Sequence, residues 1–166
     1  MLLAIISDTH LPRGPKQIPP ACVERLEAAD LILHAGDFSS VEVLRALESL
    51  APVAGVHGNV DDREVRRRLP ERRVVDVDGA RIAMVHDAGP ALGRLDRMRR
   101  RFRGVDAVVF GHSHTPLHER APGGRRGRFQ IFNPGSPTDR RREPRHTMGM
   151  ARVDDGRVEF ELVALD

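Results

Sequence analysis

Short apolar runs alternate with helix-like segments through residues 1–56, and this alternation limits the fold more than any other feature of the chain. Residues 2–6, 31–33 and 52–56 are the apolar runs, while residues 21–29 and 41–50 carry apolar side chains at helical spacing. Continuous apolar runs are typical of strands that are buried on both faces. The order strand, helix, strand, helix, strand therefore predicts a mainly parallel sheet covered by helices.

The second half of the chain reads differently, because turn signals separate closely spaced strands. Asp78-Gly79 and Asp155-Gly156 each stand between two apolar segments, which predicts two hairpins. The expected strands are residues 73–77, 81–85, 107–110, 129–132, 147–153 and 157–163; the expected helices are residues 63–69 and 92–102, and residues 120–128 form an exposed turn. An α/β first half and a β-rich second half predict a single domain over residues 1–166, with two sheets packed face to face and helices outside.

Composition narrows the classes of protein. The chain has 166 residues, of which 40% are hydrophobic and 31% charged, as in soluble globular domains. A net charge of +3 is too small to indicate nucleic-acid binding. Cys22 is the sole cysteine, so no intrachain disulfide forms, and we expect it to be buried. No signal peptide or membrane-spanning run is recognisable, which predicts a cytoplasmic protein without a membrane partner.

Five predicted strands end in side chains that bind metal ions. They are Asp8, His10, Asp37, Asn59, His86, His112 and His114. Ligands bind where strands leave an open α/β sheet, so we expect these loops to converge. Carboxylate, imidazole and amide oxygen suit divalent Mn, Fe, Ni or Zn, and the lack of cysteine here excludes a thiolate zinc site. Seven ligands exceed the needs of one ion, which predicts two ions sharing a carboxylate. Any single motif could merely cap a strand; the ordered set predicts a site.

With these motifs in order, the chain resembles the calcineurin-like metallophosphoesterase superfamily, and in particular its small stand-alone prokaryotic phosphodiesterases. The resemblance covers residues 2–136. The matching motifs are Asp8-Thr9-His10, Gly36-Asp37, Gly58-Asn59-Val60-Asp61, His86, Gly111-His112-Ser113-His114 and Asn133-Pro134-Gly135-Ser136.

The resemblance implies an αββα sandwich of two mixed sheets flanked by helices, and a dinuclear centre within it. One ion takes Asp8, His10 and His114, the other takes Asn59, His86 and His112, and Asp37 bridges them. A hydroxide between the ions attacks phosphorus, so the expected activity is hydrolysis of phosphate esters, diesters above all. The expected metal is Mn²⁺, with Ni²⁺, Fe²⁺ and Zn²⁺ left open. The expected partner is a small or nucleotide-like phosphate ester rather than nucleic acid, and a homo-oligomer is left open.

Two positions depart from the family pattern. Larger relatives have a proton-donating histidine where this chain has Val60, which cannot donate. Asp61 is the next candidate and is expected to act beside Asp37 and Asn59 in catalysis, although it could instead cap a helix. Asp87 stands where relatives usually have glycine, and we expect it to face solvent rather than orient the preceding histidine.

Other histidines and arginines leave alternatives open. His34 and His57 could line a pocket but more often such residues pack near a sheet edge, and His118 and His146 are expected on the surface. Arginine clusters within residues 66–68, 97–103 and 140–145 could bind phosphate, and the last is the first to test.

The alternative function is a non-catalytic metal-binding scaffold of the same fold, like a retromer subunit that has lost metal-site residues. The presence of all seven ligands favours catalysis.

Overall fold

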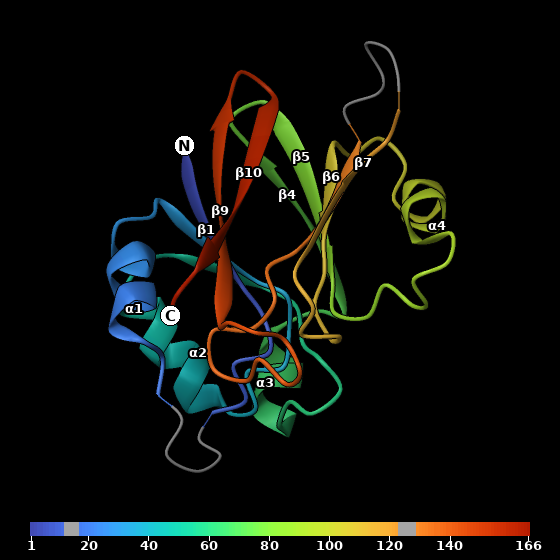
Figure 1. The fold of residues 1–166 in the computed structure, drawn as a ribbon. Helices are drawn as coiled ribbons and strands as arrows, with labels where there is room; N and C mark the ends of the chain where they lie inside the picture. The colour runs from blue at the N-terminus through green and yellow to red at the C-terminus, as the bar shows by residue number, and fades with distance from the viewer. Residues whose placement is uncertain (12–16, 123–128) are drawn as a thin grey trace.

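Two five-stranded mixed sheets pack face to face between helices, which confirms the expected αββα sandwich (Figure 1). The computed structural model describes residues 1–11, 17–122 and 129–166. The expected turn at 120–128 therefore lies largely outside the described residues.

The first sheet has the strand order β10-β9-β1-β2-β3. Strands β1 (Leu2–Ile6), β2 (Leu31–His34) and β3 (Val53–Gly55) are parallel, as the first 56 residues predicted. Strand β9 (Thr147–Asp154) runs antiparallel to β1, and β10 (Arg157–Ala164) antiparallel to β9 at the edge. The chain thus returns at its end to complete the sheet that it began.

The second sheet has the order β4-β5-β6-β8-β7. Strands β5 (Ala80–Val85), β6 (Ala107–Val109) and β8 (Gln130–Asn133) are parallel, while β4 (Arg72–Val77) and β7 (Leu117–Arg120) are antiparallel edges. Strand β7 was not predicted, because it is short and half-exposed and so lacks an apolar pattern.

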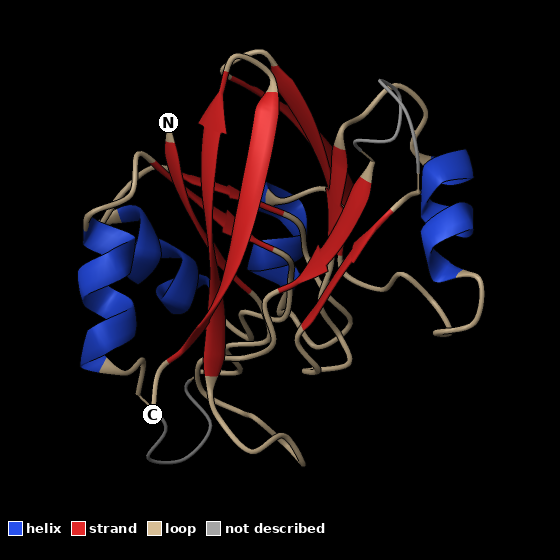
Figure 2. Ribbon diagram, turned by 45° about the horizontal axis from the view of Figure 1, so that its top comes forward, coloured by secondary structure: helices blue, strands red, loops and turns tan. Residues whose placement is uncertain are grey.

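Helices cover both outer faces of the sandwich, as Figure 2 shows. Helices α1 (Pro20–Glu27), α2 (Val41–Glu48) and α3 (Arg63–Arg68) share a buried cluster with the first sheet, and α4 (Arg94–Arg101) packs on the second. In β1, alternate side chains serve two layers. The cluster between the sheets includes Leu3, Ile5, Leu33, Ile82, Met84, Val109 and Phe132, while Ala4 and Ile6 face the helices. This explains the unbroken apolar run.

The two predicted hairpin turns meet at one end of the sandwich. Asp78, Gly79, Asp155 and Gly156 all have positive φ, as tight hairpins require, and the Gly156 N–H donates to the Asp78 carbonyl at 2.8 Å. The carboxyl ends of β1, β2 and β3 lie at the opposite end (Figure 1). That opposite end is where the candidate ligands follow.

Other features of the described residues agree with the composition. Cys22 is buried, and burial raises the pKa of its thiol to about 12, so it behaves as a small apolar side chain. Among the described residues, no helix has the length and apolar character to cross a membrane.

Candidate metal centre

The loops after β1, β2, β3, β5 and β6 converge, and they bring all seven predicted ligands together. Asp8, His10 and His114 form a first group. The His114 Nε2 atom lies 3.4 Å from Asp8 Oδ1, and His10 Nε2 lies 3.8 Å from the same oxygen. The two imidazole nitrogens are 3.1 Å apart. One oxygen and two nitrogens from three separate loop positions thus surround one point.

The second group meets the first through Asp37. Asn59 Oδ1 lies 3.1 Å from His86 Nε2 and 3.2 Å from His112 Nδ1. Asp37 Oδ2 lies 3.1 Å from His86 Nε2 and 3.7 Å from His10 Nε2. The Asp37 carboxylate therefore stands between the two groups, where a shared ligand must be.

The donor set fits divalent metal ions. Asp8 Oδ1 is buried and has no hydrogen-bond partner among the residues that the structure describes, and a buried charged oxygen without a partner is costly. A cation would satisfy it. Asp8 with His10 and His114, and Asp8 with Asp37 and His86, have the proximity needed to hold ions. The mixture of carboxylate, imidazole and amide oxygen suits a borderline transition ion.

Hydrogen bonds at the far ring nitrogens aim two imidazoles inward. His86 Nδ1 lies 2.8 Å from the Ala35 carbonyl, and His114 Nδ1 is bonded to the Asp139 carbonyl. A carbonyl can only accept, so we infer that both Nδ1 atoms carry hydrogen. Each Nε2 then faces the centre, and in the neutral ring its lone pair is available to a metal ion.

Burial and nearby charges shift the pKa values of three candidate ligands. Burial raises the pKa of Asp37, but the hydrogen bond and charge of His86, with the Val60 N–H, outweigh burial and lower the pKa to about 2. Asp37 is therefore ionised across the neutral range. Burial lowers the pKa of His114 in spite of the opposing charge of Asp8. Burial also lowers the pKa of His86, but the hydrogen bond of Asp37 and the nearby carboxylate charges outweigh it, so the net pKa is raised.

The glycines that precede the ligands are required by close packing. A Cβ atom at Gly58 would lie 2.0 Å from Asp37 Oδ1, and one at Gly111 would lie 1.8 Å from Ser7 Oγ. Each contact joins a loop of one strand to the ligand loop of another. The Gly-Asn and Gly-His spacing in the sequence therefore reflects how tightly these loops approach.

Most of the ligand residues adopt the left-handed backbone region. Five of the seven have φ between 49° and 69°: His10, Asp8, His114, Asp37 and His112. Residues other than glycine pay an energetic cost in this region, and such residues concentrate at functional sites. Left-handed backbone is therefore concentrated in the loops that carry the candidate ligands.

Asp61 braces the ligand loops. The buried carboxylate accepts N–H groups from Gly58 at 2.7 Å, Ser39 at 2.8 Å and Asp37 at 3.1 Å. Burial raises its pKa. The alternative that Asp61 caps α3 is wrong, because Asp62 Oδ1 accepts the Val65 N–H at 2.8 Å in that role. Its action as a proton donor stays a prediction.

Asp61→Asn should lower the free energy of unfolding by about 1–3 kcal/mol, because the new amide group would face an N–H group and leave buried donors unsatisfied. Denaturant titration of the metal-free chain measures this. Asp87→Asn is the matched control, since Asp87 is exposed and, among the described residues, accepts a hydrogen bond from the Gly89 N–H alone. Equal stability of the two variants would contradict the bracing role.

His34 packs rather than lining a pocket. It is fully buried, its ring stacks on Phe38 with centroids 3.5 Å apart, and burial lowers its pKa to about 3. Its Nδ1 accepts the Gly36 N–H at 3.1 Å, so Nε2 carries the hydrogen and donates to Thr9 Oγ1 at 3.1 Å. This neutral ring connects the loops after β1 and β2.

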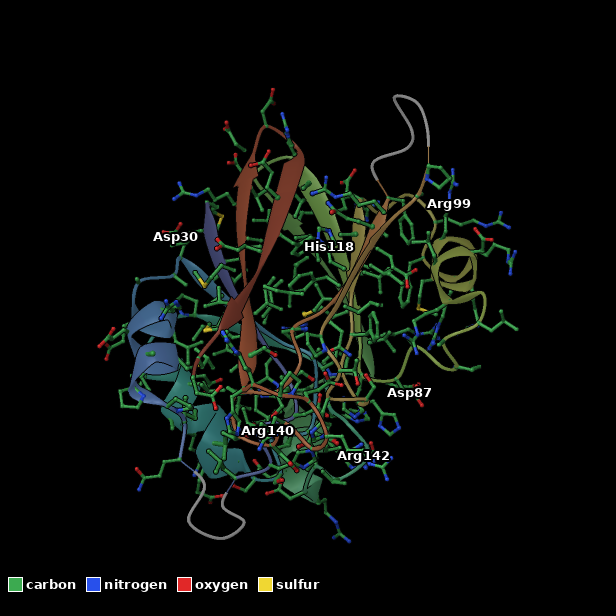
Figure 3. The ribbon with its side chains drawn as sticks, viewed as in Figure 1. Asp30, Asp87, Arg99, His118, Arg140 and Arg142 are labelled. Atoms are coloured by element: carbon green, nitrogen blue, oxygen red, sulfur yellow. The ribbon has the colours of Figure 1, made fainter. Side chains whose placement is uncertain are left out.

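A cavity of about 550 Å³ adjoins the second group of ligands. Its lining comprises His57, Gly58, Asn59, Arg66, Glu71, Val85, His86, Asp87, Arg101 and His112. His57 therefore does line a pocket. Asp87 is exposed, as expected, and Figure 3 shows it at the edge of the molecule. Of the three arginine clusters, the first two each contribute one residue to this cavity.

The third arginine cluster and the histidines expected on the surface differ in where the structure places them. The third arginine cluster, residues 140–145, follows the Asp139 carbonyl that holds His114, and it is absent from the cavity lining. The expectation that His118 lies on the surface is wrong: it is half-buried between the sheets, with its ring near Phe132 and Phe160 (Figure 3). His146 is partly exposed and pairs with Asp166 at 2.7 Å.

Comparison with known proteins places this geometry in a family. The family model for the calcineurin-like phosphoesterase superfamily domain matches residues 1–156. A probable metallophosphoesterase of Methanothermobacter thermautotrophicus is 34% identical over 167 residues, covering 98% of this chain and 92% of the relative. A phosphodiesterase of Methanocaldococcus jannaschii is 26% identical over 149 residues, covering 81% of this chain and 83% of the relative.

Solved structures share the fold. A Vps29 single mutant from Entamoeba histolytica superposes with a TM-score of 0.77 at 24% identity, covering 100% of both chains. A Thermotoga maritima protein solved by NMR superposes with a TM-score of 0.75 at 28% identity, covering 98% of both chains. With the family model matching nearly the whole sequence, the chain belongs to the calcineurin-like phosphoesterase superfamily.

Proposed function

We propose that residues 1–166 form one phosphodiesterase domain that hydrolyses phosphate esters with two divalent cations, of which Mn²⁺ is the expected one. Asp8, His10 and His114 would hold one ion; Asn59, His86 and His112 would hold the other; Asp37 would serve both. The observation that carries this proposal is the proximity of the seven side chains. Each of them has a nitrogen or oxygen atom within 3.8 Å of such an atom in another member of the set. The unpartnered Asp8 Oδ1 atom supports it further.

The residues of the site have separate roles in this proposal. When bound, paired ions lower the pKa of water and neutralise charge on the phosphate. Asp37 is fixed by the Val60 N–H, which donates to Oδ1 at 3.0 Å and leaves Oδ2 for the ions. Asn59 and His112 are exposed, so a phosphate ester can approach from their side. The adjoining cavity would receive one of the ester groups.

Diesters are preferred in this proposal because the relative named as a phosphodiesterase aligns over most of the chain. The cavity supports the same preference, since it offers room for a second ester group beside Asn59, His86 and His112. A monoester would leave that space to water.

The test is hydrolysis of bis(p-nitrophenyl) phosphate and p-nitrophenyl phosphate by protein reconstituted with Mn²⁺, with elemental analysis of the same samples. We expect the diester to be the faster substrate and the metal content to approach two ions per chain. Metal content should fall as pH is lowered, because protons compete for the histidines. A firm limit of one ion would overturn the shared arrangement. Full metal content without hydrolysis of either ester would instead identify a metal-binding scaffold.

A further inference from the structure

Two arginine side chains line the cavity without a carboxylate partner. Among the ion pairs of the described residues, neither Arg66 nor Arg101 has an acidic group within 4.0 Å. Both line the same space as the ligands Asn59, His86 and His112. Two cations that pair with no carboxylate of the described residues, beside the candidate metal centre, can bind a second anionic group.

Arg66 is held in place by the loop that carries Asn59. Its Nε–H donates to the Asp61 carbonyl at 2.9 Å and its Nη2 donates to the Asn59 carbonyl at 2.8 Å. The remaining N–H groups of the guanidinium are left for a ligand. Because two hydrogen bonds already fix the side chain, an anion bound there would cost little further side-chain entropy.

Arg101 reaches the cavity from the last residue of α4. Its guanidinium carbon lies 5.4 Å from the centroid of the Phe102 ring, which supports the side chain without neutralising it. The two arginines thus come from separate elements, α3 and α4, and meet at one cavity.

The two segments that carry these arginines are strongly basic. Residues 63–73 contain six arginines and two glutamates, and residues 94–103 contain six arginines and one aspartate, although the whole chain carries only +3. Glu71 and Asp87 also line the cavity, and both are exposed. Neither Glu71 nor Asp87 forms an ion pair with Arg66 or Arg101 in the described part of the chain, so both guanidinium groups remain open to an anion.

From these observations we infer that the cavity binds a second phosphate group of the substrate, held by Arg66 and Arg101 while the scissile phosphate lies at the metal centre. This inference rests on the proposed function and names its substrate class: phosphodiesters in which one esterified group carries a phosphate of its own, as in a phosphorylated dinucleotide. Guanidinium groups suit this role because their planar N–H groups match phosphate oxygens.

The kinetic test compares the dinucleotide dTpdT with forms that carry an added 5′- or 3′-terminal phosphate, using Mn²⁺-loaded protein. We expect one phosphorylated form to have a kcat/KM about tenfold higher than dTpdT, the effect of one hydrogen bond to a charged group. Arg101→Met should remove most of that preference. Arg99→Met is the matched control, because Arg99 lies on the same helix but is absent from the cavity lining. Figure 3 shows Arg99 beside α4, far from the converging loops.

Two kinetic outcomes would overturn the inference. Equal kcat/KM for all three dinucleotides would show that no second phosphate is bound. An equal loss of preference in Arg99→Met and Arg101→Met would show that net charge alone attracts the substrate.

A binding measurement separates this inference from the proposed function. Metal-free, ¹⁵N-labelled protein in EDTA is titrated with thymidine 5′-phosphate or with thymidine, and the Arg66 Nε–H resonance, identified by its loss in Arg66→Lys, is followed by NMR. We expect the resonance to shift with thymidine 5′-phosphate and to stay unshifted with thymidine. If bis(p-nitrophenyl) phosphate is not hydrolysed, the proposed function fails, but a phosphate-specific shift would still support the anion site. An unshifted resonance would refute the site even in an active enzyme.

Discussion

Replacing Asp37 with alanine should abolish diester hydrolysis and release most of the bound metal. Its Oδ2 atom lies within 3.7 Å of ring nitrogens in both ligand groups, so one substitution disturbs both ions. We expect the rate to fall at least about 10³-fold, more than the loss of a single electrostatic contact. Steady-state kinetics and elemental analysis of the same preparation measure the two effects.

Two further variants show whether the loss belongs to the shared position. Asn59→Ala removes a ligand from one group only and should retain more metal than Asp37→Ala. Asp154→Ala removes an exposed carboxylate at the end of β9, outside the cavity lining, and should leave both metal content and rate near those of the wild type. Near-normal hydrolysis by Asp37→Ala would refute its assignment as the shared ligand.

The second large effect concerns the leaving group. Val60 follows Asn59 and cannot donate a proton, and general acid catalysis is typically worth about 10²–10⁴-fold. The rate of hydrolysis of aryl phosphodiesters should therefore fall steeply as the pKa of the departing phenol rises. Val60→His should make the rate depend less steeply on the phenol pKa, if the imidazole reaches the leaving oxygen. For esters of the phenols with the highest pKa, the rate should rise by about 10²–10⁴-fold.

A series of aryl diesters assayed on several variants tests this expectation. Val60→Leu is the control for side-chain size and should keep the steep dependence. Asp61→Asn examines the alternative donor, and its metal content must be measured because Asp61 braces the loops. A shallow dependence in the wild type that becomes steep in Asp61→Asn would show that Asp61 is the donor. A shallow dependence in every variant would mean that chemistry is not rate-limiting.

The fold was predictable wherever local pattern and tertiary packing agree. The apolar run of β1 is buried on both faces, and the hairpin at Asp78-Gly79 has the positive φ values that its residues favour. Strand β7 was missed because Leu117–Arg120 is half-exposed and polar, and it becomes a strand by pairing with β8. The order of strands was not predictable either, since it depends on contacts between distant segments, such as β9 with β1.

The candidate site was likewise predictable only where it depends on local sequence patterns. Ligand types at strand ends predicted which seven side chains would meet, because the parallel strands of both sheets bring their carboxyl ends to the same end of the sandwich. The supporting contacts were hidden, because they depend on distances between loops. Asp61 holds backbone groups of Ser39, Asp37 and Gly58, and nothing in the local sequence distinguishes it from Asp62, which caps a helix. His118 was misplaced because its burial depends on Phe160, far along the chain.

The left-handed backbone of five ligands affects how an inactive form of this protein should be made. Alanine at such a position keeps the conformational penalty, which is roughly 1–2 kcal/mol for a residue with a Cβ atom, and removes a side chain that would bind the proposed metal. Glycine or asparagine tolerates the same φ with less strain. A variant such as His112→Gly should thus keep the native loop shape better than His112→Ala, and glycine offers no ligand atom. Loss of activity in alanine variants alone would otherwise mix the chemistry of the ligand with the folding of its loop.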